Sequence, residues 1–245
     1  GSYLKPEDLC PNCKGTRIKY LGTGTQRAEE EIRSLMPGLA FKRMDRDTTQ
    51  KKLSHYRIIK QMEEKKIDVL LGTQMVAKGH DFPDVTLSAV ISADIALNMP
   101  DFRSAERALQ LFTQLAGRAG RGEVPGRACI QTYEPEHYVF DYVRGHDYKG
   151  FYEKEIELRK ELSYPPFSRL LRIIFSFKTK DTASKIIKVI SNRIRKMNLP
   201  SSHVSKGGIE ILGPSPAPIE KIRNLWRWHI ILKGKNAKAL RQTAD

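Results

Sequence analysis

The chain has 245 residues, of which 40% are hydrophobic and 29% are charged. This length and composition fit one or two folded domains with a buried core and exclude a disordered tail. No run of apolar residues approaches the roughly 18 that are needed to span a bilayer, and the first residues lack the apolar core of a secretory signal. We therefore expect a protein that does not enter a membrane.

Positive charge is concentrated in the second part of the sequence. The formal net charge is +15; residues 1–150 carry 23 basic and 20 acidic side chains, whereas residues 151–245 carry 20 basic and 8 acidic ones. A field of this sign attracts phosphate backbones through counterion release. The alternative is a Lys/Arg surface that only keeps the domain soluble, but the concentration in one segment favours nucleic acid as the partner.

Short apolar runs alternate with helical stretches in the first part of the chain. Because helices separate the strands, the pattern predicts a parallel sheet with helices on its faces. The apolar runs at 69–71 and 85–91 predict buried strands. The predicted strands span residues 18–21, 39–41, 69–71, 85–91 and 128–133, and the predicted helices span 26–35, 50–65 and 104–119.

The second part of the chain predicts a separate, small α+β unit. Its first helix ends before Tyr164-Pro165-Pro166-Phe167, because two prolines cannot continue a helix. The fold class predicted for the whole chain is therefore α/β, followed by a small α+β domain. The second unit has predicted helices at 147–161 and 182–197, strands at 170–177 and 225–232, and a turn-rich segment at 213–218.

The strongest chemical signal is the sequence Gln-Leu-Ala-Gly-Arg-Ala-Gly-Arg-Gly at residues 114–122. If this segment is helical, Gln114, Arg118 and Arg121 fall on one face of the helix. Two guanidinium groups that point the same way suit a polyphosphate that gathers charge in its transition state. The alternative is a basic helix end that satisfies its own carbonyl groups.

Two further segments follow predicted strands. Residues 72–83 offer Thr, Gln, Lys, His and Asp at the carboxyl end of a buried strand, where ligands bind in parallel sheets. Residues 22–26 read Gly-Thr-Gly-Thr-Gln and connect a strand to a helix, so that their hydroxyl and amide groups can donate to phosphates. Ordinary turn chemistry explains a Gly-Thr loop equally well when it stands alone.

These three segments, in this order, resemble motifs IV, V and VI of superfamily-two helicases. The strings at residues 21–26, 44–49 and 78–83 resemble one family closely, the bacterial primosomal protein N-prime or PriA replication-restart helicases. Cys10-Pro11-Asn12-Cys13 stands where the zinc-binding insertion of that family ends, and residues 164–167 and 213–232 resemble its C-terminal domain. The resemblance covers essentially the whole chain.

The resemblance implies a RecA-like lobe that clamps ATP and Mg²⁺ together with a first lobe. The phosphate loop and the Asp-Glu-X-His string of the first lobe are not found here, so we expect the second lobe alone. By resemblance, Arg118 and Arg121 reach the γ-phosphate and Gln114 orients that contact. Asp81 and Gly79 are expected at the nucleotide. The residues expected to grip the DNA backbone are Thr23, Gly24, Thr73 and Gln74.

Cysteine usage indicates a reducing, cytoplasmic setting, because the count is odd and no secretion signal precedes it. Family resemblance implies that Cys10 and Cys13 bind Zn²⁺ in the intact protein, within an insertion of eight cysteines and two ions. Tetrahedral zinc needs four ligands, so the site is incomplete in this sequence. Cys129 lies in an apolar run and is predicted to be a small buried hydrophobic residue.

The last predicted strand carries two tryptophans. Trp226 and Trp228 invite comparison with base-stacking residues, but alternation places them on one face with Ile230 and Leu232, which favours a core role. The opposite face carries Arg227 and Lys233, which we expect to contact DNA, as the C-terminal domain of the family is thought to bind branched DNA.

We therefore expect a fragment of an ATP-dependent, 3′-to-5′ DNA helicase of bacterial cytoplasm that recognises stalled or branched replication forks and initiates primosome assembly. Alone, the fragment is expected to bind forked and single-stranded DNA without hydrolysing ATP. Family resemblance implies a monomeric motor, with the missing N-terminal half, single-strand-binding protein and primosome components as partners. The alternatives are a non-catalytic nucleic-acid-binding module and another superfamily-two repair helicase. The expected domains are an insertion remnant at 1–20, the lobe at 21–148 and a basic DNA-binding domain at 149–245.

Overall fold

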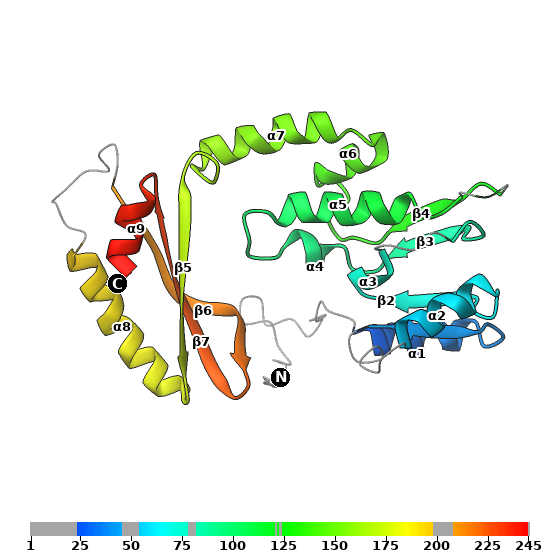
Figure 1. Cartoon of the computed structure of the whole chain (residues 1–245), viewed down its shortest axis with the longest axis horizontal. Coiled ribbons are helices and arrows are strands. Elements are labelled where there is room, and N and C mark those ends of the chain that lie inside the picture. The colour runs from blue at the N-terminus through cyan, green and yellow to red at the C-terminus, as the bar shows by residue number, and fades with distance from the viewer. Residues whose placement is uncertain are drawn as a thin grey trace, which may run out of the picture. The chain divides into compact units, whose positions relative to one another are not determined.

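The computed structural model describes residues 24–45, 54–77, 82–120, 122, 124–197 and 208–244 (Figure 1). The described residues divide into two compact units, one that ends at residue 151 and one that begins at residue 152. The division falls inside helix α7 (Tyr148–Glu161). Among the described residues, no helix is both long enough and apolar enough to cross a membrane.

The described strands of the first unit pair in parallel, as the alternation of strands and helices predicts. Strand β1 (Phe41–Met44) pairs with β2 (Val69–Gly72), and β3 (Leu87–Val90) pairs with β4 (Arg127–Ile130). Three short helices, α3, α4 and α6, have no counterpart in the sequence prediction, because so few turns give no clear periodicity. The helices before α7 are α1 (Thr25–Leu35), α2 (Ser54–Glu63), α3 (Gln74–Ala77), α4 (Asp94–Leu97), α5 (Ser104–Ala116) and α6 (Val139–Gly145).

Two apolar clusters hold the first unit together. The smaller one joins β1 and α2, with Met44 fully buried against Ile58 and Ile59. The larger one joins α4, α5, α6 and the start of α7, and its centre is Phe112, which stacks on Phe140 with ring centroids 5.9 Å apart. Helix α5, which leads into the Gly-Arg segment, is therefore anchored by the largest core of the unit.

Strands β3 and β4 are buried on one face only, which corrects two sequence predictions. Val90 and Ile130 pack against the cluster around α5, whereas Leu87 is 59% exposed. Cys129 is exposed rather than buried. Successive side chains of a strand point to opposite faces, so Cys129 and its register partner Ala89 lie on the face away from α5. The apolar sequence of these two strands therefore did not mean that both faces of each strand are buried.

The second unit is an antiparallel sheet with helices on one face. Its strand order is β5 (Arg169–Phe177), β7 (Leu225–Gly234) and β6 (Glu210–Ile222). Helices α8 (Lys180–Met197) and α9 (Ala237–Ala244) cover that face (Figure 1). Its buried core consists of Ile187, Ile194, Ile230, Leu232 and Leu240.

The segment 213–218, predicted as a turn, belongs to strand β6. The register of β6 on β7 shifts between Leu212 and Ser215 and again between Pro216 and Lys221. The strand lies at the edge of the sheet, where the missing amide donor of a proline need not break the ladder on the inner side. Edge position therefore allows three prolines in a strand whose sequence is typical of a turn.

His137 is a partly buried titratable residue beside the apolar core of the first unit, so the stability of this unit depends on pH. Its ring stacks on Tyr138, with centroids 4.8 Å apart, and its Nδ1 accepts a hydrogen bond of 3.3 Å from the amide of Val139. Burial lowers the pKa of His137, and the negative charge of Glu134 offsets this only in part. The folded chain therefore holds this imidazole neutral at pH values where the unfolded chain protonates it.

We predict that the melting temperature falls as pH decreases below the ordinary histidine pKa of about 6.5, because protons then favour the unfolded state. His137→Asn keeps an acceptor for the Val139 amide but does not titrate in this range, so its melting temperature should fall less between pH 7.5 and 5.5. Calorimetry of both proteins measures the difference. An identical fall in both would assign the pH dependence to other groups.

Candidate functional site

Helix α5 ends at Ala116, within the Gly-Arg segment and earlier than predicted. Gly117 caps it, and its amide donates to the carbonyl of Thr113 at 3.0 Å. Glycine is a poor helix former, and Gly120 has a φ of +75°, which no continuing helix allows. Arg118 lies beyond the helix, so Gln114 and Arg118 do not share a helix face, and the prediction that they do was wrong. Gln114 is exposed in the last turn.

Arg118 reaches across to the neighbouring helix α3. Its Nη2 donates a hydrogen bond of 2.9 Å to the main-chain carbonyl of Ala77, the last residue of α3. Both groups are partly buried, and the partners are 41 residues apart in sequence. The bond therefore joins the residues just beyond α5 to the end of α3, the helix that follows β2.

Two glycines hold the chain beyond Arg118 against the segment before β4. A side chain at Gly120 would overlap the backbone of Gly126, and one at Gly126 would overlap the backbone of Gly120. The amide of Gly120 donates to the carbonyl of Val85 at 2.9 Å. The Gly-rich spacing thus serves a close backbone approach, which fixes where the chain leaves Arg118.

The first residues after β2 lie exposed at the carboxyl end of a parallel strand. Thr73 and Gln74 are both exposed, and the carbonyl of Thr73 accepts the amide of Val76 at 3.1 Å. Gly72 admits no side chain, because a Cβ there would overlap the Met44 carbonyl and the Val76 side chain. This edge is where ligands bind in open α/β sheets. The predicted DNA contacts Thr73 and Gln74 are thus accessible.

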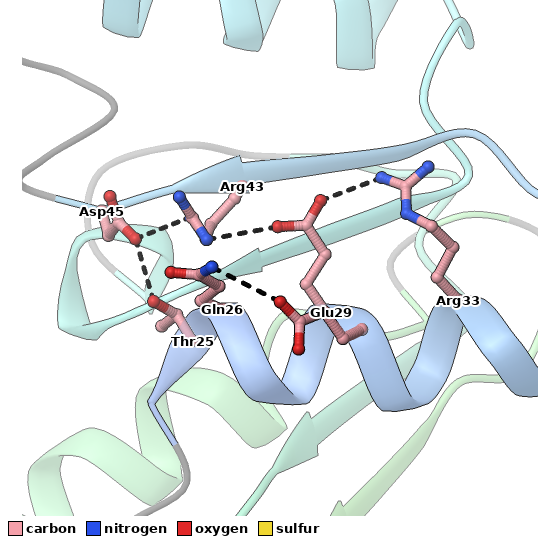
Figure 2. Close-up of polar contacts among 7 residues, drawn as sticks. Thr25, Gln26, Glu29, Arg33, Arg43 and Asp45 are labelled. Atoms are coloured by element: carbon pink, nitrogen blue, oxygen red, sulfur yellow. Dashed lines mark hydrogen bonds and ion pairs between the residues drawn. The ribbon is translucent and has the colours of Figure 1, made fainter.

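A network of ion pairs joins the start of α1 to the end of β1, as Figure 2 shows. The Thr25 hydroxyl donates to Oδ2 of Asp45 at 2.9 Å. Nε of Arg43 lies 2.9 Å from the same oxygen, and an Nη of Arg43 lies 3.4 Å from Glu29. Glu29 also pairs with Arg33 at 2.9 Å. Positive and negative side chains alternate along this network, so each carboxylate lies beside a cation.

The network fixes the first turn of α1. Asp45 is only 7% exposed, so its charge depends on Arg43 and on the hydrogen bond from Thr25. Gly24, a predicted DNA contact, is the N-cap of α1, is exposed and has open space around it. Residue spacing could not reveal this network, because Thr25 and Asp45 meet only when β1 lies beside α1.

Asp94 is a second buried carboxylate that the sequence analysis missed. Its Oδ1 accepts hydrogen bonds from the Thr132 hydroxyl at 2.9 Å and the Tyr133 amide at 3.0 Å. Burial raises the pKa of Asp94, but these hydrogen bonds outweigh burial and leave the pKa below its ordinary value. The carboxylate therefore pins α4 to the chain that leaves β4. Its position, where helix and strand segments converge, gave no sequence signal.

The two predicted DNA contacts of the second unit, Arg227 and Lys233, have different environments in the structure. Lys233 is 15% exposed; its Nζ lies 2.6 Å from Glu210 and donates to the Leu162 carbonyl at 3.2 Å. The same ammonium lies 5.5 Å from the centre of the Tyr164 ring. Lys233 is thus held by its own unit, whereas Arg227 is half-buried on β7.

Six predicted site residues lie outside the described residues, so their roles stay predictions. Among the described residues, no group of three or more His, Cys, Asp or Glu side chains could hold a metal ion. The six residues are Cys10, Cys13, Thr23, Gly79, Asp81 and Arg121.

We predict that Asp45→Asn destabilises the first unit by about 1–3 kcal/mol, because it removes the negative charge that lies 2.9 Å from Nε of the partly buried Arg43. Urea unfolding followed by circular dichroism measures this loss. The matched control is Glu31→Gln, which breaks an exposed pair with Arg27 and should cost less than about 0.5 kcal/mol. Equal losses in the two variants would contradict the structural role of the network.

Family comparisons match both parts of the chain. Residues 5–123 match the model of the helicase conserved C-terminal domain, and residues 160–245 match that of the primosomal protein N C-terminal domain. The first match contains the Gly-Arg segment, α3 and the network at α1.

Curated relatives named replication restart protein PriA align along most of the chain. The protein of Bacillus subtilis (strain 168) is 44% identical over 94% of this chain and 28% of its own length. That of Synechocystis is 40% identical over 92% of this chain and 26% of its own length, and that of Chlamydia trachomatis is 40% identical over 95% and 30%. The chain thus spans less than a third of these three relatives. It contains a helicase C-terminal domain and a primosomal protein N C-terminal domain, and it belongs to the family of the replication restart protein PriA.

Proposed function

We propose that this chain is the second motor lobe and the C-terminal DNA-binding domain of an ATP-dependent 3′-to-5′ DNA helicase. The whole protein would recognise stalled or branched replication forks and initiate primosome assembly. Family membership supports this proposal, since the relatives are replication restart proteins and the first unit matches a helicase domain. The basic second unit, with 20 basic and 8 acidic residues at 151–245, supports a contact with DNA.

The hydrogen bond between Arg118 and Ala77 is the observation that carries the motor proposal. Helix α3 begins with Gln74 and ends with Ala77, so the proposed DNA contacts Thr73 and Gln74 stand at one end and Arg118 is bonded to the other. A movement of Arg118 would therefore be passed through a single turn of helix to the residues that hold DNA. This is the coupling that a translocating motor requires.

Arg118 retains donors for a phosphate while it holds α3. A guanidinium has five N–H groups, and only Nη2 is used on the Ala77 carbonyl. With ATP bound by the first lobe, Arg118 and Arg121 would stabilise the charge that develops on the γ-phosphate, and exposed Gln114 would orient them. Mg²⁺ would be held by the first lobe, and it neutralises charge between the phosphates when bound.

A non-catalytic nucleic-acid-binding module is the second candidate function. The basic composition of residues 151–245 favours it, because such an excess of positive charge binds phosphate backbones without any nucleotide. In this case the arginines would contact only nucleic-acid phosphates, and hydrolysis would not depend on them. Enzyme kinetics distinguish the two functions.

We predict no DNA-stimulated ATP turnover from this chain alone and turnover when it is combined with the N-terminal half. In the reconstituted enzyme, Arg118→Ala and Arg121→Ala should each lower kcat by about 10³-fold, the magnitude typical of an arginine finger. Arg144→Ala, at an exposed arginine of α6, is the control and should change kcat little. Turnover by the chain alone, or unchanged kcat in both variants, would reject the motor proposal.

We predict different effects for the two cations on β7. Arg227→Gln should weaken binding to a forked oligonucleotide and make the slope of log K against log salt smaller by about 1, since one phosphate contact is lost. Lys233→Gln should lower the melting temperature instead, because it breaks the pair with Glu210. Fluorescence anisotropy at several salt concentrations and thermal unfolding measure the two effects. A Lys233 variant with weaker DNA binding and unchanged stability would reverse this assignment.

A further inference from the structure

The two tryptophans of the second unit occupy different environments. Trp228 packs against the buried cluster that contains Ile230 and Leu232, as alternation along β7 predicts. Trp226 is on the same face two residues earlier and remains partly exposed, near the start of β7. Its register partners are Phe177 of β5 and Lys221 of β6. Trp226 thus closes the end of the core rather than filling it.

Two ammonium groups converge on the ring of Trp226. Nζ of Lys221 lies 5.2 Å from the ring centre, and Nζ of Lys180, the first residue of α8, lies 5.4 Å from it. These distances are within the range of a cation–π contact. Neither ammonium forms an ion pair with another described residue. Two like charges therefore share one aromatic ring, an arrangement that an anion beside the ring would stabilise.

The surroundings of Trp226 are exposed and predominantly basic. Arg223 and Asn224 form the turn between β6 and β7, with φ values of 50° and 62°, and both are exposed. Beside the turn, Ile222 is 40% exposed and Leu225 is 37% exposed. The cations of this end, Lys178, Lys180, Lys221 and Arg223, outnumber its carboxylates, Asp181 and Glu220.

We propose that Trp226, Lys180 and Lys221 form a stacking site for single-stranded DNA. A base stacks on the indole, and the lysines exchange their contact with the ring for the phosphates on either side of that base. A single strand fits better than a duplex, because paired bases expose only their edges. The inference rests on the proposed DNA-binding function of this unit and names the surface and the form of DNA that it takes.

Fluorescence tests the contact directly, because the chain contains only two tryptophans. Trp228→Phe leaves Trp226 as the sole indole, and titration with a 15-residue oligothymidine should quench its fluorescence with the same midpoint as anisotropy of the labelled oligonucleotide. Trp226→Phe is the matched control, in which only the core indole remains, and it should show little quenching. If Trp228→Phe does not fold, comparison of the wild-type chain with Trp226→Phe gives the same information.

Affinity measurements add a second criterion. Trp226→Ala should weaken binding of the oligothymidine at least fivefold, whereas affinity for a blunt duplex should change less than twofold. Lys180→Gln with Lys221→Gln should weaken oligothymidine binding and reduce its dependence on salt.

Three results would overturn the inference. If Trp226 is not quenched although anisotropy shows binding, the stacking site is rejected while DNA binding by the unit stands. If an oligoglutamate of equal charge quenches Trp226 as strongly as the oligothymidine, the surface takes any anion and the stacking site is again rejected. If neither oligonucleotide nor duplex binds, the proposed DNA-binding function of the unit fails as well.

Discussion

The Arg118 guanidinium donates a hydrogen bond of 2.9 Å to the Ala77 carbonyl, and this bond links two segments of the first unit that carry candidate site residues. It spans 41 residues of sequence and joins the end of α5 to the end of α3. Helix α5 packs into the largest buried cluster of the unit through Phe112 and its neighbours, whereas α3 has only four residues. A short helix held at one end by a charged donor can change position when that donor finds another partner. A phosphate is such a partner.

Two further features of this unit fix the backbone near its candidate site residues. Gly120 and Gly126 bring two backbone segments together, so the chain beyond Arg118 has one path. The buried Asp45 holds Thr25 and Arg43, and it thereby sets the position of the exposed loop end at Gly24. Gly24, a candidate contact for nucleic acid, thus stands beside an element that is fixed by charge, whereas Thr73 and Gln74 lie at the start of α3, whose other end is bonded to Arg118.

The second unit distributes its cations unequally. Lys233 forms an ion pair with Glu210 and donates to the Leu162 carbonyl, so it stabilises the fold although its position on β7 suggests a DNA contact. Lys180 and Lys221 instead share the ring of Trp226 at the open end of the sheet. A count of positive charges therefore overestimates the surface available to phosphate. Local pairing determines which cations remain for a ligand.

The sequence alone determined the α/β class, the parallel pairing of the first unit, most long helices and the family. Hydrophobic periodicity and the order of motifs can both be read along the chain without knowledge of tertiary contacts. Alternation also predicted a core role for both tryptophans; Trp228 packs against the core, whereas Trp226 remains partly exposed at its end. Tertiary structure decided the end of α5 at Ala116, the exposure of Cys129, the strand character of residues 213–218 and the network around Asp45. Helix α5 ends at local glycines, although helical periodicity predicted that it continues. The other three features depend on neighbours that are distant in sequence, and spacing along the chain carries no information about those neighbours.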